Sequence, residues 1–241
     1  MSDDLNKRSY PKHDYDEYPK TLPADDFWGQ VRRTVNGESV DGKQIGMIVN
    51  AVRAGLAFKP SDGLLDIACG NGALSKEFFD NVECFLGIDS SEYLISVAKA
   101  NFAIPPNFLF ERIDVRSFLS SERQFPELSK AMCYGSFSYF SKEDGEYLLR
   151  TLSLRCPNIE TLFIGNNPDL DRAHLFYKDA PVDRELLRIH RSQIGIWRTE
   201  REFVELAHRF GWECEFRNMQ PEFYASRYRF DVVLRRNRVG E

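Results

Sequence analysis

The segment from Leu64 to Leu74 constrains the fold more than any other part of the chain. It reads as an apolar run with an acid, Asp66, near its end, then a turn of small residues, and then the start of a helix. Small residues let the backbone approach a ligand closely, and a helix N-terminus offers N–H groups that have no partner within the helix. We therefore predict a strand, a ligand-binding turn and a helix in direct succession.

Two further acids stand at the ends of apolar runs. Asp89, which lies 23 positions after Asp66, closes the run that begins at Cys84. Asp114 follows the run that begins at Phe108. In an open α/β sheet the ligand lies at the C-terminal ends of the strands, and an acid at the tip of the second strand can accept both hydroxyls of a ribose. The spacing therefore predicts one site that collects all three acids.

Short apolar runs alternate with helical segments from Pro60 onward. This alternation indicates a mostly parallel sheet with helices on both faces. The stretch from Pro168 to Arg198 is too long for an ordinary connection, so we predict an insertion over the site. The expected strands are 64–68, 84–88, 108–113, 131–134, 161–165, 212–216 and 230–234, and the expected helices are 73–79, 93–101, 142–155 and 199–210.

The region before Pro60 reads differently. Residues 1–24 are rich in Tyr, Pro, Lys and Asp and predict an arm without regular structure. A short helix over 27–33 and a second helix capped by Asp41 follow. We therefore expect residues 1–58 to form an arm with helices that cap the active site. Residues 59–241 then form the main domain, with a substrate lid at 168–198.

Composition excludes several classes of protein. The formal net charge of −5 disfavours a general nucleic-acid binder, which needs a positive surface. No apolar run approaches the roughly 18 residues of a membrane helix, and the N-terminus is polar, so we expect neither a membrane segment nor a signal peptide. Five cysteines without a Cys-x-x-Cys pair and four scattered histidines predict no metal site and no disulfide framework, and favour a cytoplasmic location.

On the residues around Asp66, Asp89 and Asp114 the chain resembles the class I S-adenosylmethionine-dependent methyltransferases. The resemblance spans residues 60–165 in motif and extends to the C-terminus in the order of strands and helices. It implies a Rossmann-like, seven-stranded, mostly parallel sheet of order 3-2-1-4-5-7-6 with helices on both faces. The N-terminal helical arm and the insertion after strand 5 would be added to this domain.

The resemblance also assigns roles. Asp66 would begin the glycine loop that faces the methionine part of the cofactor, with Ala68 standing where the first glycine is usual. Asp89 would bind the ribose, and Asp114, with the N–H of Val115, would bind the adenine. The cofactor-binding residues implied in this way are Asp66, Ala68, Cys69, Gly70, Asn71, Gly72, Asp89, Ser90, Asp114, Val115, Tyr134 and Gly135.

A dinucleotide-binding fold is the nearest rival. Its Gly-x-Gly-x-x-Gly spacing is absent, because Leu74 and Ser75 stand where a third glycine would fall. The carboxylate of Asp66 would also repel a pyrophosphate. Both observations favour the methyltransferase type.

The methyl acceptor is less constrained by the sequence. Methyl transfer from a sulfonium is an in-line displacement, for which amines need only be unprotonated while sugar hydroxyls usually need a general base. We take His174, His190 and Tyr139 as candidate catalytic residues. The candidate substrate-binding residues are Trp28, Arg33, Ser136, Asn167, Tyr177, Arg188 and Arg191.

The leading hypothesis is O- or N-methylation of a small polar metabolite such as a sugar or nucleotide-sugar. Arginines of the second half, Arg184, Arg188, Arg191 and Arg198, are candidates for clamping a phosphate on a phosphorylated or nucleotide-linked acceptor. Methylation of protein or RNA is one alternative, although the net charge of −5 disfavours a nucleic-acid partner. A non-catalytic partner subunit with the same fold is the other.

Overall fold

The computed structural model describes residues 14–35, 37–177 and 182–237, and within them a seven-stranded sheet. Its strands are β3 Gly63–Ile67, β4 Cys84–Asp89, β5 Phe108–Arg112, β6 Lys130–Tyr134, β7 Thr161–Pro168, β8 Trp212–Arg217 and β9 Arg229–Arg236. They lie in the order β5-β4-β3-β6-β7-β9-β8, which confirms the expected order 3-2-1-4-5-7-6 when β3 is counted as the first strand. The first five run parallel, while β9 pairs antiparallel with both β7 and β8.

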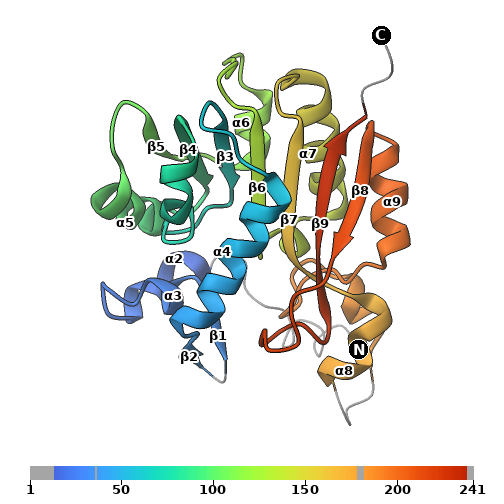
Figure 1. The fold of residues 1–241 in the computed structure, drawn as a ribbon. Helices are drawn as coiled ribbons and strands as arrows, with labels where there is room; N and C mark the ends of the chain where they lie inside the picture. Colours follow the sequence, from blue (N-terminus) through green and yellow to red (C-terminus); the bar gives the residue numbers. More distant parts are fainter. Residues whose placement is uncertain (1–13, 36, 178–181, 238–241) are drawn as a thin grey trace.

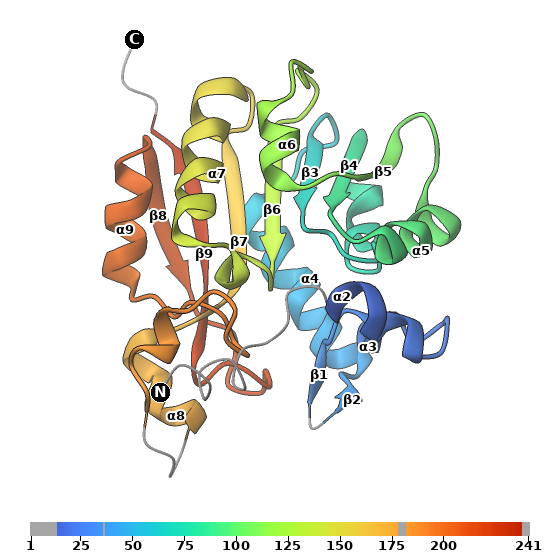
Figure 2. The same cartoon turned by 180° about the vertical axis from the view of Figure 1, so that it is seen from behind.

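Helices cover both faces of this sheet, as the alternation of strands and helices predicts (Figures 1 and 2). The helices α4 Gly42–Leu56 and α5 Glu92–Phe102, with the 3₁₀ helix η2 Ser75–Asn81, pack on one face through a cluster that includes Val52, Ile95 and Phe78. On the other face, α6 Val115–Ser120, α7 Lys142–Arg155 and α9 Glu200–His208 pack through a second cluster. The site therefore rests on a sheet that is buried on both sides.

Local sequence fixes where several of these helices begin. The carboxylate of Asp41 accepts the N–H of Gln44 at 2.9 Å, which starts α4. Thr199 and Glu202 form a capping box at the start of α9, in which each side chain accepts the other residue's N–H. The helix expected over 73–79 is instead the 3₁₀ helix η2, and α6 was not expected because its six residues are too few for a clear period.

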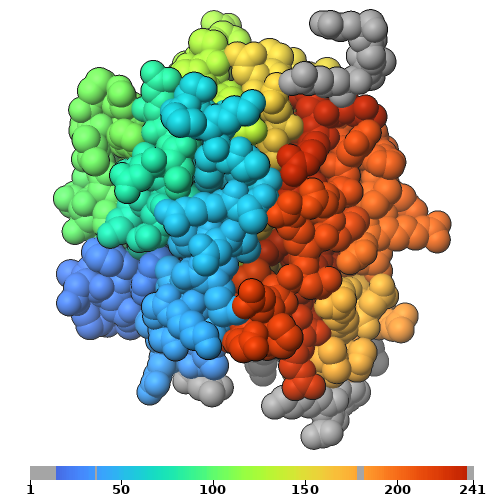
Figure 3. Space-filling model, viewed as in Figure 1, coloured from blue at the N-terminus to red at the C-terminus, as the bar shows by residue number. Residues whose placement is uncertain are grey.

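The N-terminal segment contains more regular structure than its composition predicts. It forms the helix α2 Asp14–Glu17, the 3₁₀ helix η1 Tyr18–Thr21, the helix α3 Phe27–Gln30 and the strands β1 Thr34–Val35 and β2 Glu38–Ser39. These elements lie beyond the C-terminal ends of β3 and β4, beside α4 (Figures 1 and 2). In the space-filling view the segment packs directly below the chain around η2 and β4 (Figure 3). The prediction of an arm without regular structure is thus wrong for residues 14–21, and residues 1–13 and 36 lie outside the described residues.

The insertion after β7 contains the 3₁₀ helix η4 Leu170–Arg172, the helix α8 Ala173–Tyr177 and the 3₁₀ helix η5 Leu186–Arg188. Trp197 is fully buried at its centre, packed with Ala173 and Leu187. Residues 178–181 of the predicted lid lie outside the described residues. The insertion is therefore a small folded unit with its own apolar cluster, at the same edge of the sheet as the N-terminal segment (Figure 2).

Two glycines of α4 provide a matched test of how closely this helix packs on the sheet. A Cβ on Gly55 would lie 2.4 Å from the ring of Phe163, whereas a Cβ on Gly46 would meet nothing within 4 Å. We expect Gly55→Ala to lower the free energy of unfolding by about 1–3 kcal/mol through overpacking. Gly46→Ala should raise it by about 0.5–1 kcal/mol, since alanine is the better helix former. Urea denaturation of both variants tests this, and equal effects would contradict the packing.

Candidate active site

A cavity of about 590 Å³ opens at the C-terminal ends of the parallel strands. Its walls contain Asp66, Asp89 and Asp114, so the three acids that follow the apolar runs do meet at one site. Residues of the N-terminal segment, including Trp28 and Arg33, complete the walls from the other side. The volume lies within the range of about 300–1,000 Å³ that is usual for small-molecule sites.

The turn after β3 adopts the backbone that its small residues permit. Ala68, Gly70 and Gly72 have φ angles of +58°, +59° and +76°. A Cβ on Gly72 would lie 2.7 Å from the ring of Phe110, so the second glycine is required by packing as well as by conformation. Ala68 occupies a left-handed conformation that glycine adopts more easily, which is where the sequence departs from the usual motif.

Asp89 holds this turn in place. One carboxylate oxygen accepts the N–H of Gly70 and the other accepts the N–H of Ser91, both at 2.9 Å. Burial raises the pKa of Asp89, and the nearby charge of Asp16 raises it further, while the two backbone bonds lower it. Each oxygen of an ionised carboxylate has a second acceptor site, so Asp89 retains capacity for two hydroxyl groups.

Asp66 is more deeply buried, with 3% of its surface exposed. The hydroxyl of Ser75 donates to it at 2.7 Å. Burial raises the pKa of Asp66 to about 7; the bond from Ser75 lowers it, the charge of Asp89 raises it and the charge of Arg33 lowers it. This carboxyl group is therefore suited to change its ionisation when a cation binds beside it.

Asp114 lines the far end of the cavity and is also the N-cap of a helix. It caps α6, accepting the N–H of Ser117 at 3.0 Å and its hydroxyl at 2.6 Å. Its slight burial acts to raise its pKa, but these bonds outweigh burial and lower it. Ile113 and Val115 line the cavity beside it. The cap fixes the Asp114 carboxylate at the cavity edge.

Arg33 supplies the positive charge opposite the acids. Its guanidinium lies 4.8 Å from the ring centre of Tyr134 and 5.9 Å from that of Trp28. Two of its nitrogens, Nε and Nη1, are buried without a hydrogen-bond partner. Buried donors without partners are costly, so the side chain is suited to receive an anion at this end of the cavity.

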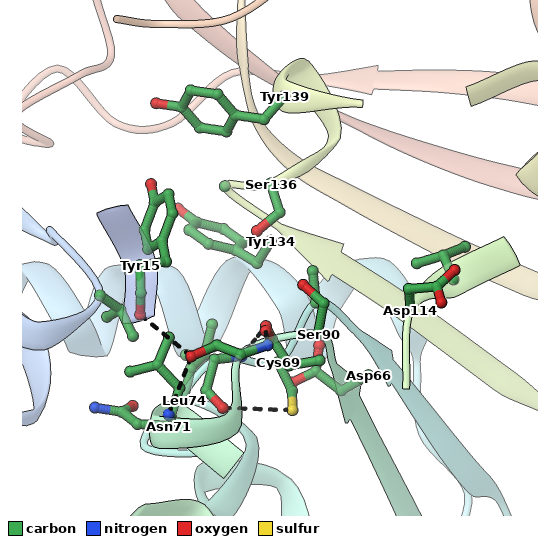
Figure 4. Close-up of a pocket in the computed structure, with 18 of the residues that line it drawn as sticks. Tyr15, Asp66, Cys69, Asn71, Leu74, Ser90, Asp114, Tyr134, Ser136 and Tyr139 are labelled. Carbon is green, nitrogen blue, oxygen red and sulfur yellow. Dashed lines mark hydrogen bonds between the residues drawn. The ribbon is translucent and has the colours of Figure 1, made fainter. Parts of the chain in front are cut away.

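The remaining walls are aromatic. Tyr15, Tyr134 and Tyr139 gather at one end of the cavity, away from Asp114, and Ser136 lies between the last two (Figure 4). The hydroxyl of Tyr139 donates to the carbonyl oxygen of Gln193 in the insertion at 2.9 Å. Burial raises the pKa of both Tyr134 and Tyr139. These hydroxyl groups therefore stay protonated at neutral pH, so neither is suited to take a proton from a ligand.

Asn71 explains how the N-terminal segment is held against the glycine turn. Its side-chain amide donates to the carbonyl oxygen of Phe27 at 2.8 Å and to Gln30 Oε1 at 3.0 Å. These bonds attach α3 to the turn. Asn71 thus lines the cavity and also places Trp28 in its wall.

Several candidate residues lie outside the cavity walls. His174, Tyr177, Arg188, His190 and Arg191 all belong to the insertion, and none of them lines the cavity. Arg188 is paired with Glu202 at 2.7 Å, and the guanidinium of Arg198 stacks on buried rings. The phosphate clamp predicted from these arginines therefore has no counterpart in the cavity.

Two further positions depart from the expected pattern. Gly72 packs behind the turn, away from the cavity, and Asn167 is turned into the sheet, where its side chain donates to the carbonyl oxygens of Ile164 and Phe230. Sequence reasoning also missed Asp16, Arg116 and Asp144, which line the cavity. The sequence around Asp16 is only rich in Tyr and Pro and gives no indication of a binding site. Arg116 could have been found, because it directly follows the Asp114-Val115 pair.

Solved structures of known proteins share this fold. Magnesium protoporphyrin IX methyltransferase from Synechocystis PCC 6803, with bound SAH, superposes with a TM-score of 0.64 at 16% identity, covering 93% of this chain and 97% of that chain. A cyclopropane synthase from Mycobacterium tuberculosis superposes with a TM-score of 0.62 at 12% identity, covering 94% of this chain and 99% of that chain. The methyltransferase domain of a bacterial Hen1 protein superposes with a TM-score of 0.59 at 14% identity, covering 80% of this chain and 99% of that chain. No curated protein sequence matches the chain.

The match to a family model is independent of the structural comparison. Residues 64–154 match the model described as a methyltransferase domain, and this range runs from β3 through the glycine turn to the end of α7. This part of the chain therefore matches a methyltransferase domain, in agreement with the shared fold and with the resemblance in the sequence.

The residues that line the cavity fit S-adenosylmethionine, the cofactor that the resemblance implies. S-adenosylmethionine has a cationic ammonium and an anionic carboxylate at one end, and Asp66 and the unpartnered nitrogens of Arg33 provide the opposite charges. The described residues contain no group of three or more His, Cys, Asp or Glu side chains able to hold a metal ion. None of the described helices has the length and apolarity needed to cross a membrane.

The raised pKa of Asp66 predicts a pH-dependent stability. The pKa of about 7 in the folded chain exceeds the ordinary value of about 4, so folding favours the protonated form. The contribution of this group is full below pH 4 and is lost as the pH rises through 7. We expect Asp66→Asn to be more stable than the parent at pH 8, by on the order of 2–4 kcal/mol, and to differ little at low pH.

Urea denaturation of the ligand-free protein at pH 5.0 and pH 8.0 measures this difference. Asp80→Asn, which removes an exposed carboxylate close to the same sheet face, serves as the control and should show no pH-dependent gain. The same stability difference for Asp66→Asn at both pH values would contradict the assignment.

Proposed function

We propose that the enzyme transfers the methyl group of S-adenosylmethionine to a nitrogen of a small polar metabolite. The supporting observation is the aromatic end of the cavity, where Tyr15, Tyr134, Tyr139 and Phe140 surround the space beside Gly135. A cavity of about 590 Å³ favours a small acceptor over a polymer, and the segment that carries Tyr15 forms one of its walls. The amino group of an amino sugar or nucleotide-linked sugar belongs to this class of acceptor.

In this proposal the cofactor lies across the three acids. Its ribose hydroxyls donate to Asp89, and its adenine lies between Ile113, Val115 and Asp114. The methionine end lies between Asp66 and Arg33. The sulfonium supplies an electrophilic methyl group, and the walls formed by residues 15–33 exclude water from it. Residues before α4 thus act as a cap, whereas α4 itself packs on the sheet.

The chemistry of the acceptor end favours nitrogen over oxygen. Transfer to a sugar hydroxyl needs a group that removes its proton, and the polar groups beside Gly135 are hydroxyls, a guanidinium and the amide of Asn166. Burial raises the pKa of Tyr134 and Tyr139, so they donate hydrogen bonds at neutral pH. An uncharged amine attacks the methyl carbon with its own lone pair and loses its extra proton to water afterwards.

Incorporation of label from S-adenosyl-[methyl-³H]methionine into fractionated cell extract tests the proposal. The small-molecule fraction that passes an ultrafilter is assayed before and after acetylation of its amines with an N-hydroxysuccinimide ester. We expect incorporation that acetylation abolishes. Incorporation that survives acetylation would indicate an oxygen acceptor, label confined to the retained protein or RNA would support a polymer substrate, and no incorporation anywhere would support a non-catalytic subunit.

Removing the ribose acceptor should weaken cofactor binding. Asp89→Ala deletes a buried carboxylate that would accept hydrogen bonds from two hydroxyl groups. We expect the Kd for S-adenosylhomocysteine to rise at least tenfold, which corresponds to a loss of about 1.4 kcal/mol of binding free energy. Glu92→Gln serves as the control, because Glu92 starts the next helix but is exposed and paired with Arg112. Calorimetry on both variants measures the effect, and an unchanged Kd for Asp89→Ala would contradict the ribose site.

The charge state of Asp66 should make cofactor affinity depend on pH. Since its pKa is about 7 in the free enzyme and a bound ammonium favours the ionised form, binding releases a proton below pH 7. We expect the affinity for S-adenosylhomocysteine to rise up to about tenfold between pH 5.5 and pH 8. In Asp66→Asn this rise should flatten. A parallel rise in both proteins would assign the effect to another group.

A further inference from the structure

Asn166, near the end of β7, has a backbone conformation that the fold maintains at some cost. Its φ of +63° is in the left-handed region, and the pairing of β7 with β9 shifts register between Ile164 and Asn167. Non-glycine residues in this region carry strain that the surrounding structure must compensate, and such residues gather at functional sites.

Two charged side chains of β9 hold the Asn166 backbone. Asp231 accepts its N–H at 2.6 Å, and the guanidinium of Arg229 donates to its carbonyl oxygen at 2.5 Å. Asp231 is 1% exposed, and burial raises its pKa to about 6, although the bond from Asn166 lowers it. A buried carboxyl group is costly, so its use to fix one backbone position suggests that the position has a function.

Asn166 is not itself one of the residues that line the cavity, but its side chain lies beside Gly135, which is. Its Nδ2 is 3.7 Å from the place that a Cβ on Gly135 would take, as is Nη2 of Arg33. Gly135 lines the cavity between Tyr134 and Ser136. Asn166 and Arg33 therefore flank the space directly in front of Gly135.

The amide of Asn166 is available for a ligand. Its Oδ1 is buried and has no hydrogen-bond partner among the described residues. Rotation about the Cβ–Cγ bond exchanges Oδ1 and Nδ2 without breaking a side-chain hydrogen bond, so the oxygen can take the place of Nδ2 beside Gly135. An unsatisfied buried amide oxygen gains a hydrogen bond from a ligand donor, and an amine supplies such a donor in its N–H group.

We infer that Asn166 orients the acceptor amine, and that Asp231 and Arg229 are positioning residues that hold Asn166 in place. This inference rests on the proposed function. The amide oxygen accepts one N–H of the amine, which leaves the nitrogen lone pair directed at the methyl carbon. The N–CH₃ bond forms as the CH₃–S bond breaks, the sulfur keeps the electron pair, and the resulting ammonium loses its proton to water.

Three substitutions at this position separate function from folding. Asn166→Gly removes the amide but suits a φ of +63°, so it should fold at least as well as the parent. Asn166→Ala removes the amide with some strain, and Asn166→Asp keeps an oxygen acceptor. Asn101→Ala, which deletes an exposed amide on α5, is the matched control.

The assay is the transfer of label from S-adenosyl-[methyl-³H]methionine to the small-molecule fraction of cell extract, with binding of S-adenosylhomocysteine measured in parallel. We expect Asn166→Gly and Asn166→Ala to lose about tenfold to a hundredfold in rate while S-adenosylhomocysteine binds within about twofold of the parent. Asn166→Asp should recover part of the rate. Asp231→Asn, which keeps an oxygen for the Asn166 N–H, should retain more activity than Asp231→Ala.

The outcomes distinguish the two proposals. A parental rate in Asn166→Gly would overturn the role of Asn166 while leaving the enzyme a methyltransferase. Equal rates in Asp231→Asn and Asp231→Ala would overturn the positioning role. No transfer by the parent protein to any fraction would contradict the proposed function, and the inference about Asn166 with it.

Discussion

The site depends on one carboxylate, that of Asp89, which binds the backbone of the glycine turn and of the segment after β4 at the same time. Its bonds to the N–H groups of Gly70 and Ser91 join two neighbouring strand ends into one surface. The glycine turn also holds α3, because the amide of Asn71 donates to the carbonyl oxygen of Phe27. The N-terminal wall of the cavity is thus attached to the sheet through a short series of hydrogen bonds that starts at Asp89.

This arrangement separates two chemical environments within one cavity. Asp16, Asp66, Asp89 and Asp114 make one end acidic, and burial raises the pKa of Asp66 and Asp89. The other end is aromatic. In the proposed binding mode, a cofactor with net positive charge would relieve the repulsion among these acids and offset part of the stability that is lost by burying them. Stability and cofactor affinity are therefore opposed at these positions.

Much of the fold follows from local patterns in the sequence. The order of strands, the cap at Asp41 and the bounds of α7 all follow from apolar period and capping residues. The three acids meet because the C-terminal ends of parallel strands lie at one edge of a sheet. Local patterns do not predict structure that depends on tertiary contacts. The helix α2 is only four residues long, and its regular structure depends on contacts with Ser91 and the cavity wall.

The acceptor end shows the same limit of local reasoning. The arginines of the insertion resemble a phosphate clamp in sequence, but Arg188 pairs with Glu202 and Arg198 stacks on Phe137. Of the two adjacent asparagines at the end of β7, the sequence predicts Asn167 as a substrate-binding residue. A bulge in β7 turns Asn167 into the sheet and places Asn166 beside Gly135. Neither ion pairing across elements nor the position of a bulge has a reliable sequence signal.

A crystal structure of the protein with S-adenosylhomocysteine tests the central claim most directly. The account predicts density for the product in the described cavity, with both ribose hydroxyls on Asp89 and the amino-acid end between Asp66 and Arg33. It also predicts that the sulfur faces Gly135 and the three tyrosines. Density with the amino-acid end at Asp114, or a product bound elsewhere on the molecule, would contradict it.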